Sequence, residues 1–215
     1  MKIAVIGATG TVGRGVVREA ASRGHQVVAF ARNVDKVEQL DNVQAVAFDV
    51  NAADFAEQLK GFDAVVSAFN GGWTNPNAGA DFEKGANAIT EAAKAAAVPY
   101  LLVVGGAGSL YIEPNVQLID TPEFPKEIYD GANAARNWLK DLQNRRDVNW
   151  SFISPPAMFE GDIETRSGKY RVGKDEVLFT GDELANISLP DLACAIIDDV
   201  ETKGHLFERF TVAEA

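Results

Sequence analysis

The most regular feature of the chain is a series of short, continuous apolar runs separated by longer segments of mixed polarity. Such runs predict strands that are buried on both faces, as in a parallel sheet, because a strand with one exposed face would alternate apolar and polar positions. The runs lie at residues 3–6, 27–30, 43–48, 64–67, 101–104 and 150–153.

The segments between several of these runs carry apolar residues at intervals of three and four, which predicts amphipathic helices. Three such stripes cover residues 82–96, 128–142 and 189–200. Ser188, followed by Pro190 and Asp191, is typical of a helix start. Strands that alternate with helices favour an α/β fold, a doubly wound parallel sheet with helices on both faces. We expect residues 1–215 to form one domain, since no linker or repeat interrupts them.

Two segments have no clear periodicity. Residues 105–125 are rich in Gly, Pro and Asp, and residues 155–185 carry Pro, Gly and short strand-like pieces. Both follow the carboxyl ends of predicted strands, where open α/β sheets bind their ligands. We therefore expect substrate loops there, with residues 155–185 and the C-terminal segment forming a small cap on the substrate side.

A glycine-rich loop joins the first predicted strand to the following helix. It has the pattern Gly-x-x-Gly-x-x-Gly and consists of Gly7, Ala8, Thr9, Gly10, Thr11, Val12 and Gly13. The first glycine would allow a tight turn, the second a close approach of the backbone to a pyrophosphate, and the third close packing of helix on strand. No Gly-Lys-Ser/Thr follows, so the loop is not a P-loop. The alternative is a glycine-rich turn without a ligand.

The end of the second predicted strand indicates which dinucleotide would bind. Proteins that bind NAD often have an Asp or Glu here for the ribose 2′-hydroxyl, whereas an Arg suits the 2′-phosphate of NADP. This strand ends with Arg32 and Asn33 and has no acid. We therefore predict a preference for NADPH over NADH, the alternative being that Arg32 is simply a solvated cation.

Composition narrows the class of protein. With 20 Lys and Arg against 31 Asp and Glu, the 215-residue chain has a formal net charge of −11, which disfavours binding to nucleic acids or anionic membranes. One cysteine, Cys194, and two histidines leave little material for disulfides or a metal site. No apolar run is long enough to span a membrane. We expect a cytoplasmic protein, a monomer or homodimer, with a small-molecule substrate and no metal.

With these features in hand, the chain resembles the atypical short-chain dehydrogenases/reductases. The likeness is greatest to the NAD(P)H-binding family of putative NADH-flavin reductases, which overlaps with the NmrA-like and biliverdin-reductase-B-like proteins. It covers essentially the whole chain, and the segments that carry it are 7–13, 49–50, 103–109, 154–159, 187–193 and 209–212.

The resemblance implies a Rossmann-like fold and a set of cofactor contacts. Asp49 and Val50 would lie near the adenine. The nicotinamide end would be bordered by Pro155, Ala157 and Met158. Further cofactor contacts are implied for Ala68, Phe69, Asn70 and Gly105. Loop capping by Asp49 and ordinary packing of the apolar residues are the alternatives.

The catalytic residues are less clear. Related dehydrogenases use a Tyr-x-x-x-Lys pair, in which the Lys lowers the pKa of the Tyr, together with a Ser after the fifth strand. Here Tyr129 is followed four residues later by Asn133, which carries no charge. Tyr129 and Ser109 remain the catalytic candidates, with Tyr111 a weaker one; Trp73 could stack on an aromatic acceptor.

The missing Lys favours acceptors that need no protein-bound acid. A flavin or quinone ring is electron-poor and can take its proton from water, so that the protein mainly orients the two rings. We therefore expect an NADPH-dependent reductase of a small conjugated acceptor, with FMN or FAD as conceivable substrates. The alternative is a regulatory protein that senses NADP(H) without turnover, as NmrA-like proteins do; sugar-epimerase chemistry fits less well without the Tyr/Lys pair.

Overall fold

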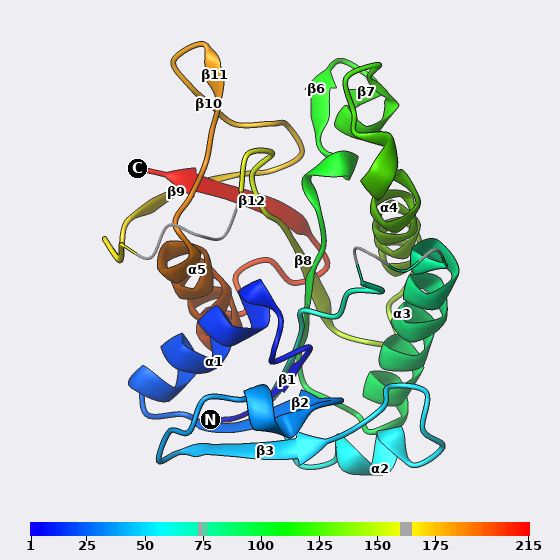
Figure 1. The fold of residues 1–215 in the computed structure, drawn as a ribbon, viewed down its shortest axis with the longest axis vertical. Coiled ribbons are helices and arrows are strands. Elements are labelled where there is room, and N and C mark those ends of the chain that lie inside the picture. Colours follow the sequence, from blue (N-terminus) through cyan, green and yellow to red (C-terminus); the bar gives the residue numbers. More distant parts are fainter. Residues whose placement is uncertain (73–74, 76, 160–164) are drawn as a thin grey trace.

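A single large sheet forms the centre of the molecule (Figure 1). The structure, a computed structural model, describes residues 1–72, 75, 77–159 and 165–215. Within that part of the chain the sheet contains β1 (Lys2–Ile6), β2 (Gln26–Ala31), β3 (Val43–Ala47), β4 (Ala64–Ser67), β5 (Leu101–Val104), β8 (Trp150–Ser154), β9 (Tyr170–Gly173) and β12 (Arg209–Glu214). The strand order is β3-β2-β1-β4-β5-β8-β12-β9, and neighbours are parallel except for the β12–β9 pair.

Helices cover both faces of the sheet (Figure 1). One face packs against α1 (Thr11–Ser22) and α5 (Leu189–Thr202), and the other against α2 (Phe55–Gln58), α3 (Ala78–Ala95) and α4 (Tyr129–Gln143). Ser188 caps α5 as expected, since its hydroxyl accepts a hydrogen bond from the Asp191 N–H at 3.2 Å. The six apolar runs and three helical stripes are all present, so the predicted α/β class is confirmed.

The core consists of two apolar layers, one on each face of the sheet. Phe152, Ile89 and Trp138 belong to the layer under α3 and α4. The layer under α1 and α5 includes Val16 and Ile196. Burying one such side chain stabilises the fold by about 1.5–3 kcal/mol. Because both faces are covered, the central strands need apolar residues at every position, which explains the continuous runs in the sequence.

The cap expected from the sequence differs from what the structure shows. The C-terminal segment is β12, which lies inside the central sheet between β8 and β9. Two hairpins stand beyond the sheet, β6 (Tyr111–Glu113) with β7 (Val116–Gln117), and β10 (Phe179–Thr180) with β11 (Glu183–Leu184) (Figure 1). Phe210 and Val212 of β12 belong to the apolar layer under α1 and α5, and the strand pairs parallel with β8 and antiparallel with β9. Among the described residues, no helix has the length and apolar character needed to cross a membrane.

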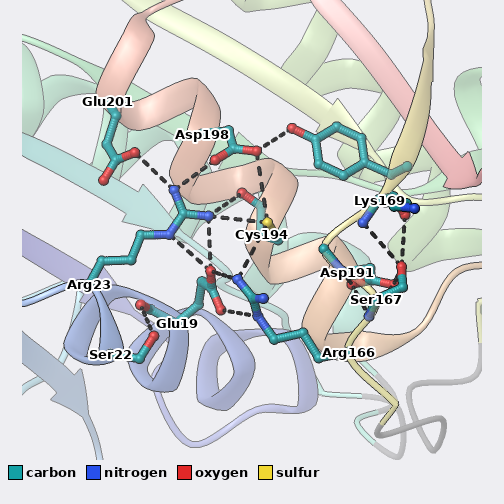
Figure 2. Close-up of polar contacts among 12 residues, drawn as sticks. Glu19, Ser22, Arg23, Arg166, Ser167, Lys169, Asp191, Cys194, Asp198 and Glu201 are labelled. Carbon is teal, nitrogen blue, oxygen red and sulfur yellow. Dashed lines mark hydrogen bonds and ion pairs between the residues drawn. The ribbon is translucent and has the colours of Figure 1, made fainter.

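A polar cluster joins α1 and α5 to the segment that precedes β9 (Figure 2). Buried Glu19 accepts hydrogen bonds from Arg23 at 2.9 Å and from Arg166 at 2.8 Å. Arg23 also donates to Asp198 at 2.7 Å. Burial would raise the pKa of Glu19, but the hydrogen bonds from Arg166 and Arg23 outweigh it and hold the pKa below its usual value. This cluster holds the 165–170 segment against the two helices.

Candidate functional site

The site lies where the strand order reverses, between β1 and β4. Gly7 directly follows β1 and has a φ of +77°, a backbone conformation that favours glycine. A Cβ at Gly7 would lie 2.4 Å from the carbonyl oxygen of Ala68, which directly follows β4. The turns that follow β1 and β4 therefore lie against each other. The crevice at this point of a doubly wound sheet is where such sheets bind their ligands.

The glycine loop presents the start of α1 to this crevice. Gly10 is the N-cap residue, no side chain caps the helix, and its first turn contains no acid. The N–H of Gly10 donates to the Gly7 carbonyl at 3.0 Å, which closes the turn. A Cβ at Gly13 would lie 2.1 Å from the same carbonyl oxygen, so only glycine allows the helix to begin this close to the strand. Free backbone N–H groups and the positive end of the helix dipole make this an anion site that fits a pyrophosphate.

Two adjoining cavities extend from the start of α1. The smaller has a volume of about 390 Å³ and reaches Arg32, Asp49 and Val50 at the ends of β2 and β3. The larger, of about 840 Å³, extends the other way, toward β5, β8 and α4. Both are lined by Gly10, Ala68, Phe69, Asn70, Gly71 and Asn75. The shared residues make the two cavities one groove that crosses the anion site, and the volume of the larger cavity leaves room for a ligand ring beside a cofactor.

Charged residues of both signs line the smaller cavity. Arg32 is exposed and faces the same cavity as Lys84, which α3 contributes. Asp49 accepts hydrogen bonds from the backbone N–H and side chain of Asn51, and these bonds hold its pKa below the usual value. The Asp49 carboxylate is thus charged at neutral pH, and two cations lie near it. Lys84 was not foreseen from the sequence, because its position on a helix surface gives no signal.

Most of the predicted cofactor residues line the groove. These are Gly7, Thr9, Gly10, Thr11, Val12, Arg32, Asp49, Val50, Ala68, Phe69, Asn70, Gly105, Pro155, Ala157 and Met158. Three others do not line it. Ala8 is buried and its N–H donates to the Phe30 carbonyl, Gly13 packs on Gly7, and the Asn33 side chain accepts from the Asp35 N–H at 3.0 Å.

The two catalytic candidates do not line either cavity. Ser109 is 3% exposed, and its hydroxyl accepts a hydrogen bond from Arg209 Nη1 at 3.3 Å. Tyr129 is 38% exposed and lies edge-on to Phe124, with ring centroids 6.4 Å apart. Asn133, at the position of the family's Lys, accepts hydrogen bonds from Arg136. Trp73 lies outside the described residues.

The larger cavity has further walls that the sequence did not single out individually. Phe124 and Ile128 contribute apolar surface, and Glu123, Glu127 and Asp130 contribute carboxylates. Glu123 and Phe124 belong to the 105–125 segment, which was expected to form a substrate loop. Glu127 and Ile128 lie in the 3-10 turn Lys126–Ile128 just before α4, and Asp130 lies in the first turn of α4. Only the fold of the chain brings these three residues to the groove.

Comparisons with known proteins agree with this geometry. A family model described as NAD(P)H-binding matches residues 7–201. YwnB of Bacillus subtilis, an uncharacterized protein, is 41% identical over 214 residues, which cover 99% of this chain and 98% of that protein.

Solved structures give the same result. A protein from Bacteroides thetaiotaomicron described as a putative epimerase superimposes with a TM-score of 0.90 and 36% identity, over 99% of this chain and 96% of that one. SP1627 of Streptococcus pneumoniae, described as a putative NADH-flavin reductase, superimposes with a TM-score of 0.86 and 33% identity, over 100% of both chains. Since the family match spans most of the sequence and includes the glycine loop, the chain belongs to the NAD(P)H-binding family of oxidoreductase-like proteins with a Rossmann-like fold.

Proposed function

We propose that this protein is a reductase that uses NADPH in preference to NADH and reduces a conjugated ring of the quinone or flavin class. The observation that carries the proposal is the continuity of the groove. The smaller cavity, which Arg32 lines, joins the larger cavity at the start of α1. The larger cavity has a volume of about 840 Å³, which leaves room for a second ring. The description of SP1627 as a putative NADH-flavin reductase supports the same class of reaction.

Charges in the smaller cavity support the preference for NADPH. Arg32 and Lys84 would face a 2′-phosphate, and each charge-assisted hydrogen bond to it contributes about 1.5–3 kcal/mol. Asp49 lies at the end of β3 rather than β2, and its carboxylate already accepts from Asn51. The end of β2 offers no carboxylate for the paired hydroxyls of an NADH ribose.

The larger cavity would hold the nicotinamide and the acceptor. Pro155, Ala157 and Met158 line it on the β8 side, and Phe124 and Ile128 on the α4 side. These apolar side chains would pack against the two rings and orient them face to face, which is the main contribution that a protein makes to hydride transfer.

The chemistry needs no acid from the protein. Bound NADPH supplies a hydride, and with a proton from water the acceptor becomes the dihydro ring or hydroquinone while NADP⁺ remains. Tyr129 has no Lys partner, and Asn133 in its place is held by Arg136. A carbonyl or alcohol substrate would need a proton donor near the hydride acceptor, whereas a quinone or flavin would not.

The direct test measures oxidation of NADPH at 340 nm with menadione, 1,4-benzoquinone and riboflavin as acceptors, in parallel with NADH. We expect turnover of at least one ring and a kcat/KM for NADPH at least about tenfold above that for NADH. Tight binding of NADPH without turnover of any ring would reject a reductase and favour an NADP(H)-sensing protein. Equal kcat/KM values for the two cofactors would reject the preference.

A further inference from the structure

The charged residues in the walls of the larger cavity are all acidic. Glu123, Glu127 and Asp130, all three exposed to solvent, line it, and no Lys or Arg among the described residues does. The eight residues outside the described part include no Lys or Arg either. An acceptor in this cavity would therefore meet negative charge and no cationic side chain.

These carboxylates are not neutralised by ion pairs. In the part of the chain that the structure describes, Glu123, Glu127 and Asp130 form no salt bridge, whereas nearby Asp120 is held by Arg136 at 2.8 Å. Lys126 lies between Pro125 and Glu127 in sequence, but it is exposed and does not line the cavity. The negative charge of these three carboxylates is thus not compensated by an ion pair.

The helix ends around the cavity point to the same conclusion. Besides α1, both α3 and α4 begin at this cavity, where Ala78 and Asp130 line it. A free helix N-terminus attracts anions, but α3 has Asp81 and α4 has Asp130 in the first turn, so their dipoles already face a carboxylate. Only α1 lacks an acid there, and its N-terminus is the site expected for the cofactor pyrophosphate.

From this distribution we infer that the acceptor carries no anionic group: it is a neutral or cationic ring, such as an unsubstituted quinone or a flavin ring without phosphate, and phosphorylated flavins are poor substrates. The inference rests on the proposed function. The step is the same as above: a hydride passes from NADPH to the ring, water supplies the one proton that completes the reduced ring, and NADP⁺ is the other product. What the inference adds is that the cavity discriminates between acceptors by charge.

Riboflavin and FMN form a matched pair for the test, because they share the reactive ring and differ by a phosphate. Two quantities would be measured at low ionic strength: kcat/KM with NADPH, and the Kd of each oxidised flavin for the NADP⁺-loaded protein, from the quenching of flavin fluorescence. We expect riboflavin to be favoured over FMN by at least about tenfold in both, and salt to reduce the difference. Menadione against its sulfonate gives the same comparison for quinones.

Charge-neutralising variants test whether these three carboxylates cause the preference for riboflavin over FMN. In the triple variant Glu123→Gln, Glu127→Gln and Asp130→Asn, the preference for riboflavin should fall to about threefold or less. The control Asp41→Asn, Glu113→Gln and Asp182→Asn removes the same net charge at exposed acids outside both cavities and should keep the preference.

Equal or better use of FMN by the wild type would overturn the inference and leave the proposed reductase intact. A preference that survives in the triple variant would also overturn it. If no ring turned over, the proposed function would fail, and the Kd comparison would still decide whether the cavity rejects anions.

Discussion

Gly13 and Gly7 lie so close together that a Cβ on Gly13 would be 2.1 Å from the Gly7 carbonyl oxygen. Neither residue can move away easily, because the added Cβ would meet a backbone oxygen and Gly7 itself lies close to Ala68. We predict that Gly13→Ala displaces the loop, raises the Kd for NADPH at least about tenfold and lowers the free energy of unfolding by about 1–3 kcal/mol.

Gly131→Ala is the matched control for this variant. A Cβ there meets nothing within 4 Å, and the residue lies within α4. Because Gly131 also lines the larger cavity, this variant is a control for stability alone. Helix propensity alone should make that protein more stable by up to about 1 kcal/mol. Titration of Gly13→Ala and of the wild type with NADPH, together with urea unfolding of both glycine variants, would check the prediction. Unchanged NADPH affinity in Gly13→Ala would contradict the assigned role of the loop.

Arg32 and the 2′-phosphate give a second prediction. Arg32→Ala should raise the Kd for NADPH about 10- to 100-fold, which corresponds to one charge-assisted contact, and should alter the Kd for NADH less than about threefold. Lys84→Ala should have a smaller effect in the same direction. The control is Lys36→Ala, an exposed cation that does not line the groove. An equal rise in the Kd for NADPH and for NADH in Arg32→Ala would show that Arg32 does not bind the 2′-phosphate.

Glu19 should make stability depend on pH. Its pKa in the folded protein lies below the usual 4.5 because Arg166 and Arg23 favour the carboxylate. A lowered pKa contributes stability above the unfolded-state value, and that contribution is lost as the pH falls through the folded-state value. Glu19→Gln should therefore cost about 1–3 kcal/mol at pH 7, and the difference from wild type should shrink below pH 4.5. Urea unfolding over a pH series tests this, and a pH-independent difference would argue against the charged pair.

Buried Asp199 joins α5 to the sheet. Its carboxylate accepts hydrogen bonds from Tyr100 at 2.8 Å, from Ser151 at 2.7 Å and from both the backbone and the ring of His205. Asp199→Ala would leave these buried donors without a partner, so we predict a loss of about 3–5 kcal/mol in the free energy of unfolding. Asp182→Ala, at an exposed position, should change it by less than about 0.5 kcal/mol. A loss below about 1 kcal/mol in Asp199→Ala, by the same urea measurement, would show that water replaces the carboxylate as the hydrogen-bond acceptor.

The hydroxyls of Ser109 and Tyr129 provide the last prediction. Since neither residue lines the groove, Ser109→Ala and Tyr129→Phe should each change kcat/KM for a quinone less than about threefold. Ser109→Ala should instead lower stability by about 1 kcal/mol, because Arg209 Nη1 loses an acceptor. A tenfold or greater loss of kcat at unchanged KM in either variant would show that its hydroxyl takes part in the catalytic step.

Much of the fold follows from local patterns in the sequence. The sheet is buried on both faces, so each central strand is recognisable as an apolar run, and Ser188 with Asp191 marks the start of α5 through one hydrogen bond. The glycine loop is recognisable for a similar reason, since Gly7 and Gly13 satisfy steric requirements that no other residue meets. Both features depend on short-range backbone geometry.

Other parts of the site depend on contacts between distant segments. Lys84 lies on α3 and lines the groove only because α3 packs on one face of the sheet. The hydroxyl of Ser109 turns toward Arg209, a hundred residues later, and no local pattern records that pairing. The C-terminal strand is likewise placed inside the sheet by its pairing with β8 and β9. Side-chain direction and strand order are thus what the sequence leaves open.

The most direct test of the central claim is a single-turnover experiment. Protein loaded with one equivalent of NADPH is mixed without oxygen with menadione, and the absorbance at 340 nm is followed in a stopped-flow instrument. The account predicts loss of that absorbance with formation of one equivalent of hydroquinone, faster than in a mixture without protein and slowed in Gly13→Ala. Persistence of the NADPH absorbance, with both ligands shown to be bound, would contradict it.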